Sequence, residues 1–406
     1  MWRNRDYVAL WTGETISDIG SQMSFFLFPL LAYAVTGSTF QAGLTAASYA
    51  TVRLALLLPA GALVDRWNRR ATMLVSSACG VVLYGSIAVA EALGRLTIAH
   101  LILVSLAIGA TSTFFSPAEI SVVKVVVPTS QLPGAMSAHQ ARYQLSALTS
   151  APLGGALYTV ARWLPFAVDA VSFAISCLTV CSIRTSLRAP ARNPAVPRHL
   201  WHEMVEGLRF IWSSSFLRMF LSITTIINFA GQGFFLVLTL RLLANGVSPV
   251  VIGLIDTMGA VAGIAGAVMA PWFMRHLRPW AIAAPAAWAI VVATGLMPWT
   301  MHVTLIGALL AGMMVFTPMV NASLISYRIA ITPELLQGRV QSASKFVSGA
   351  ALPLGPLIGG WLMGVIGARA AMLVFVCCFA VGAVVATLSV AIRGVPRPQE
   401  WERIAS

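Results

Sequence analysis

Gly61-Ala-Leu-Val-Asp65-Arg66-Trp67-Asn-Arg69-Arg70 closes a long apolar run and is the most informative stretch of this chain. It places one acid and three arginines where a hydrophobic segment would leave a bilayer. A second copy follows 205 residues later (266 − 61), as Gly266-Ala-Val-Met-Ala-Pro-Trp272-Phe-Met-Arg275. The glycine, the following alanine, the tryptophan and the last arginine are kept, whereas Ala270 replaces the acid. A duplicated unit is therefore indicated, in which only the first copy kept its carboxylate.

The same offset relates further pairs along the chain, which are Pro128 and Pro333, Ser137-Ala138 and Ser342-Ala343, and Gly154-Gly155 and Gly359-Gly360. The duplication thus covers most of the sequence. Two related halves with unequal charge favour a membrane transporter.

The composition is that of a membrane protein. Of 406 residues, 58% are hydrophobic and only 10% are charged, whereas soluble domains carry about a quarter charged residues. A spanning helix needs about 20 apolar residues, and the long apolar runs lack the period-two alternation of a membrane barrel. We predict an all-α membrane protein with twelve transmembrane helices in two pseudo-twofold-related six-helix bundles. The expected spans are about 8–36, 41–64, 72–93, 97–123, 135–160, 164–184, 214–243, 248–274, 279–300, 303–330, 338–365 and 369–392.

The net charge of +13 indicates how the chain is oriented in the membrane and does not indicate a nucleic-acid partner. Most arginines fall in the segments assigned to one side of the membrane, whereas the opposite loops hold only Arg95, Arg162, Arg241 and Arg369. Cytoplasmic loops are enriched in Lys and Arg. Both termini are therefore predicted to be cytoplasmic.

The predicted organisation has four parts. Residues 1–184 form the first bundle, 185–213 a cytoplasmic linker, 214–393 the second bundle and 394–406 a tail. The linker begins with prolines and arginines and then repeats apolar residues at helical spacing, at Trp201, Val205, Leu208 and Trp212. This pattern predicts an amphipathic helix on the inner membrane surface.

Acids inside apolar runs are costly and usually mark function. Glu14, Asp18 and Gln22 form one polar stripe at i, i+4 and i+8, and Tyr49 and Arg53 form another pair at i, i+4. Asp18 and Arg53 both lie roughly 15–18 Å from the cytoplasmic side at 1.5 Å per residue. We hypothesise that Asp18 pairs with Arg53 and that proton binding competes with this pair. A purely structural ion pair explains the same residues equally well.

Further ionisable residues fall within predicted spans. Glu119 and Arg142 lie at a similar shallow depth and are expected to pair, with a structural role favoured. Asp256 is a second candidate for proton binding. Arg328 and Lys345 have no acid at their depth, and either attract an anionic substrate or extend to the interface.

Several motifs carry a resemblance to a known family. Gly61-x-Leu63-x-Asp65-Arg66-x-x-Arg69-Arg70 is similar to the signature between helices 2 and 3 of the major facilitator superfamily. The resemblance narrows to the drug and siderophore exporters, which include macrolide efflux proteins and the enterobactin exporter. The narrowing motifs are Leu10-Trp11-x-Gly13-x-x-x-Ser17-Asp18-x-Gly20, Phe114-Phe115-Ser116-Pro117-Ala118, Asp169-Ala-Val-Ser172-Phe173, Glu206-Gly-Leu-Arg209-Phe and Gly338-Arg339-Val340.

The resemblance implies alternating access around a site near the bilayer midplane. It also implies a conformational latch, in which Asp65 meets the positive N-terminus of helix 11 near Arg339; a simple helix-end cap is the alternative. The latch residues are Gly61, Asp65, Arg66, Arg69, Arg70 and Arg339. One departure concerns helix 5, where the antiporter motif has a displaced proline, Ala151-Pro152-Leu153-Gly154-Gly155.

The substrate cavity is expected to be apolar. Aromatic and methionine surfaces with few polar groups suit bulky amphipathic ligands, although any one aromatic residue could instead face lipid. The candidate lining residues are Gln22, Phe26, Tyr49, Phe115, Arg142, Tyr143, Asn228, Gln232, Phe235, Phe316 and Lys345.

The sequence excludes several classes. Neither Lys124 nor Lys345 stands in a P-loop, no histidine pair has metal-ligand spacing inside a span, and no nucleophile elbow is present. No enzyme activity, metal or cofactor is therefore expected. We predict a monomeric exporter in the bacterial cytoplasmic membrane that exchanges protons for an amphipathic drug, antibiotic or siderophore-like molecule. Proton-coupled nutrient uptake and lipid translocation by the same fold are the alternatives.

Overall fold

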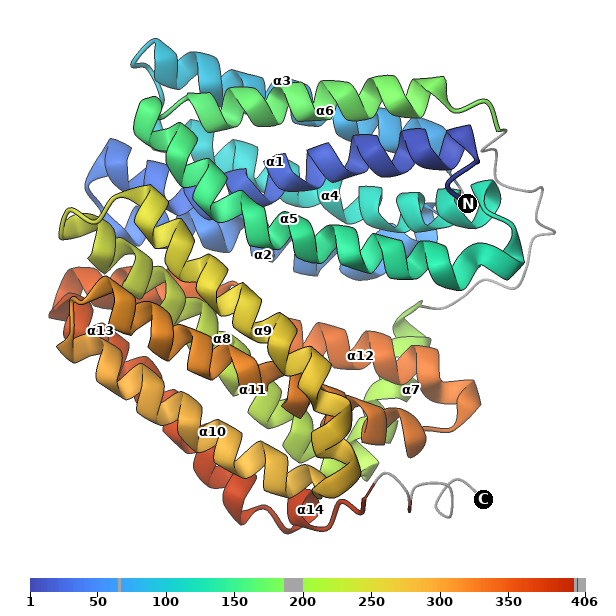
Figure 1. Ribbon diagram of the computed structural model, residues 1–406, viewed down its shortest axis with the longest axis vertical. Helices are drawn as coiled ribbons and strands as arrows, with labels where there is room; N and C mark the ends of the chain where they lie inside the picture. The colour runs from blue at the N-terminus through green and yellow to red at the C-terminus, as the bar shows by residue number, and fades with distance from the viewer. Residues whose placement is uncertain (65–66, 186–199, 398–399, 401–406) are drawn as a thin grey trace. The chain divides into compact units, whose positions relative to one another are not determined.

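The computed structural model describes residues 1–64, 67–185, 200–397 and 400, and this part of the chain is built from helices without a strand (Figure 1). Two compact units are formed. The first comprises Met1–Pro197 with Gly246–Gly253, and the second comprises Arg198–Asn245 with Leu254–Ser406.

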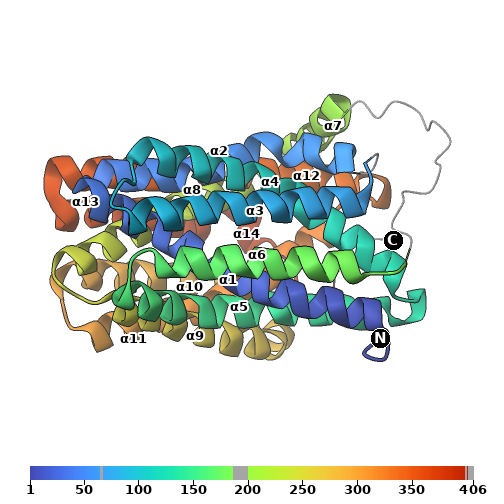
Figure 2. The same cartoon turned by 90° about the horizontal axis from the view of Figure 1, so that it is seen from above.

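The first unit contains six long helices. They are α1 (Arg5–Thr36), α2 (Thr39–Val64), α3 (Arg69–Ala92), α4 (Ile98–Val126), α5 (Leu132–Val160) and α6 (Leu164–Ser182), with the 3-10 turn Thr129–Gln131 before α5. Helix α2 packs on α4, α3 packs on α6, and α1 packs on both α5 and α6. Figure 2 shows α3 and α6 side by side.

The second unit repeats this arrangement with additions. Its helices are α7 (Leu200–Ser213), α8 (Ser215–Ala244), α9 (Pro249–His276, whose first turn belongs to the first unit), α10 (Pro279–Leu296), α11 (Val303–Ala330), α12 (Gln337–Gly349), α13 (Leu354–Leu388) and α14 (Val390–Arg393), with 3-10 turns at Met297–Trp299 and Glu334–Leu336. Helix α8 packs along α13, and α7 packs on α12.

The helices have the lengths that a bilayer requires. Within the described ranges, nine helical segments are long and apolar enough to cross a membrane, and one of them is the combined segment Glu334–Leu388. Helices α2 and α5, with 26 and 29 residues, also exceed the roughly 20 residues of a span.

The predicted continuous span 338–365 is wrong in one respect. The helix stops after Gly349 and restarts at Leu354, so that α12 and α13 are separate. Pro353 precedes the restart, and a proline inside a helix removes a hydrogen bond and clashes with the preceding turn. A second break lies inside α13, where Gly367 has φ 79°, a conformation that favours glycine. The residues after Gly367 form the last span.

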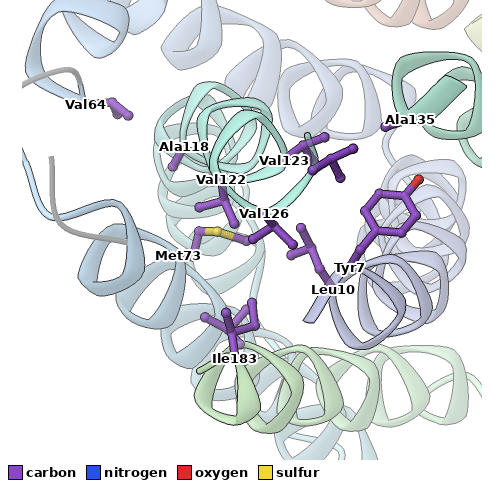
Figure 3. Packing of buried hydrophobic residues seen from close by; sticks show 12 residues of the cluster. Tyr7, Leu10, Val64, Met73, Ala118, Val122, Val123, Val126, Ala135 and Ile183 are labelled. Carbon is purple, nitrogen blue, oxygen red and sulfur yellow. The ribbon is translucent and has the colours of Figure 1, made fainter. Parts of the chain in front are cut away.

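An apolar core lies at one end of the first unit (Figure 3). Tyr7 and Leu10 of α1 pack with Met73 of α3, Val122 of α4 and Ile183 after α6. All five are buried. This core fixes the ends of four helices, and Tyr7 and Leu10 also contact a small hollow that includes Glu119 and Arg142.

Candidate functional site

The first unit encloses a cavity of about 310 Å³ between its own helices. Charged side chains from four helices line it, and aromatic rings and hydroxyl groups complete the walls. The charged and histidine residues are Glu14, Asp18, Arg53, Glu119, His139 and Arg142. The hydroxyl and amide groups are those of Ser17, Ser21, Gln22, Thr45, Ser76, Ser105, Thr111, Ser112 and Ser116. Aromatic rings were expected in the cavity and are present, whereas the small hydroxyl residues that several helices bring to the same space were not expected.

Arg142 lies at the centre of the charged group. Its Nη2 donates to Glu119 Oε1 at 2.6 Å, and its Nε lies 2.8 Å from Asp18 Oδ2. The Arg142 and Glu119 side chains are only 3% and 6% exposed, whereas Asp18 is 29% exposed toward the cavity. The predicted pairing of Glu119 with Arg142 is confirmed.

The two contacts of Arg142 are not equivalent. The contact to Glu119 has hydrogen-bond geometry, whereas the Nε and Oδ2 atoms that face each other across the Asp18 contact make no aligned hydrogen bond. A charged pair without this alignment loses part of its stabilisation. Asp18 therefore makes the less well aligned of the two contacts to Arg142.

His139 joins the group from one turn before Arg142. Its Nδ1 lies 3.2 Å from Arg142 Nη2 and 3.5 Å from Glu119 Oε1. A neutral imidazole accepts at Nδ1 from the arginine, whereas a protonated ring turns that atom into a donor to the carboxylate. His139 was not among the predicted site residues, although its i, i+3 spacing to Arg142 places both on one helix face.

Glu14 is a second buried acid on α1, 1% exposed. Ser176 Oγ donates to Glu14 Oε1 at 2.8 Å, and Ser77 lies 3.1 Å from the same serine. In the described part of the chain, no cation lies within 4.0 Å of this carboxylate. Glu14 therefore depends on hydroxyl groups rather than on a counter-charge.

The predicted pairing of Asp18 with Arg53 is wrong, because Arg142 occupies Asp18 instead. The Arg53 guanidinium faces Tyr49, with Nη1 3.5 Å from the phenol oxygen and Cζ 5.5 Å from the ring centroid. Depth along a helix could be computed from the sequence, but the rotation of α1 and α2 about their axes could not.

Asp169 of α6 is fully buried outside the cavity lining. Ser24 Oγ donates to its Oδ2 at 2.5 Å and Ser172 Oγ to its Oδ1 at 3.0 Å. A Cβ atom at Gly20 would lie 2.4 Å from Oδ1, so the glycine permits this close approach of α1 and α6. Sequence analysis quoted Asp169 within a motif but did not assign it to a site.

The predicted latch involves residues of both units and stays a prediction. Asp65 and Arg66 lie outside the described residues. Gly61 has open space around it, and Arg70 donates to the carbonyl groups of Val180 and Cys181 at the end of α6. Arg339 of α12 pairs with Glu206 of α7 at 2.5 Å. Arg69, at the first residue of α3, has a buried Nε without a hydrogen-bond partner among the described residues.

The predicted cavity residues separate by unit. Gln22, Tyr49, Phe115, Arg142 and Tyr143 line the cavity, whereas Phe26 packs in the core at 9% exposure. The remaining candidates belong to the second unit; they are Asn228, Gln232, Phe235, Phe316, Lys345 and the proton-site candidate Asp256.

Those second-unit residues have local surroundings of their own. Asn228 donates to Ser348 O at 3.0 Å, Phe316 packs against an apolar cluster, Lys345 is exposed and Asp256 is half-buried. Arg328, considered as an anion site, is buried and donates to Gln341.

Comparison with known proteins identifies the family. Residues 10–351 match the sequence profile of the Major Facilitator Superfamily. The chain belongs to this superfamily. The multidrug efflux pump Tap of Mycolicibacterium fortuitum is 23% identical over 367 residues, which cover 87% of this chain and 88% of that protein. The multidrug efflux pump Tap of Mycobacterium tuberculosis is 27% identical over 207 residues, which cover 49% of each chain.

Solved structures share the superfamily fold. A bacterial homologue of the human lysosomal transporter Spinster aligns with a TM-score of 0.72 and 14% identity, over 97% of this chain and 98% of that one. A bacterial homologue of the iron transporter ferroportin also aligns at 0.72 and 14%, over 94% and 98%. The predicted fold class is confirmed, and this superfamily member is a multi-pass membrane transporter rather than an enzyme.

Proposed function

We propose that this chain is a monomeric exporter of the bacterial cytoplasmic membrane, with both termini in the cytoplasm, that exchanges protons for an amphipathic small molecule of the drug or antibiotic class. Two multidrug efflux pumps are among its relatives, and the first of them matches along most of both chains. The cavity offers aromatic rings and hydroxyl groups to such a ligand.

One observation carries the proposal, namely that the single guanidinium of Arg142 is shared by two carboxylates in the cavity. Two anions compete for one cation in a space where uncompensated charge is costly. A proton on Asp18 removes one competitor, and Arg142 is then left to Glu119. The site thus has two arrangements that differ by one proton.

The proton and the substrate bind to the same site at different steps of the transport cycle. Asp18 is the more exposed of the two acids that share Arg142, so that it meets both water and ligand in the cavity. Binding of the ligand beside Asp18 favours one charge state of the pair, and proton uptake restores the other. Differential binding of two ligands to two states is what couples them. Alternating access of the cavity then turns this competition into antiport.

Reconstitution in liposomes tests the proposal. Purified protein with an imposed pH gradient is expected to accumulate lipophilic drugs against their gradient and to move protons in the opposite direction. Asp18→Asn is expected to abolish gradient-driven accumulation while the protein remains folded and able to equilibrate the substrate. Glu334→Gln, which changes an exposed acid far along the chain, serves as the control.

The outcomes separate the alternatives. Full pH-driven activity of Asp18→Asn would remove Asp18 from the coupling mechanism. Substrate movement in the same direction as the protons would replace antiport by symport. Lipid translocation without proton movement would assign the chain to lipid transport.

A further inference from the structure

Arg53 is a cation that the ion-pair network leaves unmatched. Its guanidinium lines the cavity and is exposed there. An arginine remains charged in a protein. No carboxylate of the described residues lies within 4.0 Å of it, because Asp18 and Glu119 are both held by Arg142. A charge at this depth needs a counter-ion, and among the described residues its close polar partners are the Tyr49 ring and phenol oxygen.

Helix register places Arg53 apart from Glu119. Ser105 Oγ donates to Thr45 O, and a Cβ atom at Gly109 would lie 2.7 Å from Tyr49 O. Helices α2 and α4 are thus parallel here with an offset of 60 residues (105 − 45 and 109 − 49). Glu119 is therefore level with position 59, which is six residues or about 9 Å along the axis from Arg53. Arg53 and Glu119 therefore lie at different levels of the cavity.

An aromatic surface lies beside the cation. The rings of Tyr49 and Phe25 are 5.1 Å apart, and the Tyr49 hydroxyl lies 3.4 Å from Ser112 Oγ. Phe115 lines the same cavity. Arginine binds planar anions through paired N–H donors, and aromatic rings pack against ligand rings at short distance. The Arg53 guanidinium and the neighbouring aromatic rings together form a surface that is charged at one end and apolar at the other.

We propose that the cavity selects aromatic organic anions or zwitterions, whose acidic group binds Arg53 and whose ring packs on Tyr49 and Phe25. The export of such compounds rests on the proposed function. The binding preference does not, because it is a property of the cavity itself. A purely cationic ligand leaves Arg53 without a counter-ion and adds a second like charge beside it.

A matched ligand pair tests the proposal without any gradient. The probes are a xanthene dye with a free carboxylate and the methyl ester of the same dye. Their equilibrium binding to purified protein in detergent micelles is followed by fluorescence anisotropy. The acid is expected to bind the native protein more tightly than the ester. Arg53→Gln is expected to weaken binding of the acid about tenfold or more and to leave the ester unchanged.

Two further variants control for charge and for general effects. Arg53→Lys is expected to retain part of the preference for the acid, because the charge remains but the paired donors are lost. Arg162→Gln removes an exposed arginine that does not line the cavity and is expected to bind like the native protein.

Several results would overturn the proposal. These are an unchanged acid-to-ester ratio in Arg53→Gln, a native preference for the ester, and loss of both ligands in Arg53→Gln without a partial return of the acid preference in Arg53→Lys. Failure of gradient-driven export in liposomes would instead overturn the proposed function and leave the binding preference standing.

Discussion

The two units share a helical plan but stabilise equivalent places differently. Helices α4 and α11 begin 205 residues apart, at Ile98 and Val303, as do α5 and α12, at Leu132 and Gln337. The same offset carries Glu119 to Leu324 and Arg142 to Val347. Where the first unit has a buried ion pair, the second has two apolar residues of one core cluster.

This difference shows that the fold does not need the ion pair. A hydrophobic pair of similar volume is often as stable as a buried ion pair or more stable, and the second unit realises that alternative. Within the described residues, the second unit has one ion pair, Glu206–Arg339, and both partners are more than a third exposed. Its cations Arg328 and Arg241 bind the neutral oxygens of Gln341 and Met297. We therefore expect the charges buried in the first unit to serve transport rather than stability.

The repeated decapeptide has also diverged. A Cβ atom at Gly266 would lie 1.9 Å from the carbonyl oxygen of Val315, so that α9 and α11 touch through their backbones. Gly61, the equivalent glycine, has no atom of the described structure within 4 Å of the same position. The glycine of the second copy, Gly266, lies at a close contact between α9 and α11, whereas the glycine of the first copy, Gly61, has no close neighbour among the described residues.

The largest effect is expected from Arg142→Met. Removing the cation leaves Asp18 and Glu119 without a counter-charge, which should cost about 3–5 kcal/mol of the free energy of unfolding. Titration with SDS in mixed micelles measures that quantity. The triple variant Asp18→Asn, Glu119→Leu and Arg142→Val, which copies the second unit, should recover most of the stability but no proton-driven transport. A stable Arg142→Met protein would break the comparison.

An intermediate effect is expected from the two equivalent glycines. Gly266→Ala forces α9 away from the Val315 carbonyl and should lower the free energy of unfolding by about 1–3 kcal/mol. Gly61→Ala meets no neighbour and should change it by less than about 0.5 kcal/mol. The same SDS titration compares the pair directly. Equal losses for both would show that the copies have not diverged in packing.

The smallest effect is expected at the exposed pair of the second unit. Glu206→Arg places two cations together and should cost less than about 1 kcal/mol, since solvent screens exposed pairs. The double variant Glu206→Arg with Arg339→Glu should restore the native value. A double-mutant cycle from thermal unfolding measures the coupling. A loss comparable to that of Arg142→Met would mean that this surface contact matters as much as the buried group.

Sequence patterns predicted those features that depend on position along a helix. Apolar runs gave the spans to within a few residues, and depth along α4 and α5 gave the pairing of Glu119 with Arg142. Features that depend on how helices are rotated were missed. Asp18 faces Arg142 instead of Arg53, Phe26 faces the core, and the hydroxyl-rich cavity wall could not be distinguished from ordinary helix packing. The break before Leu354 was missed although Pro353 marks it.

The contacts of Arg142 have a mechanical consequence. Asp18, Glu119 and Arg142 belong to α1, α4 and α5 respectively, so a single guanidinium connects three helices at one point. Neutralising either acid is expected to weaken a contact between two helices, and any resulting displacement grows with distance from that contact. Binding of one proton is in this way expected to move the ends of helices that are about 40 Å long, given 1.5 Å of rise per residue.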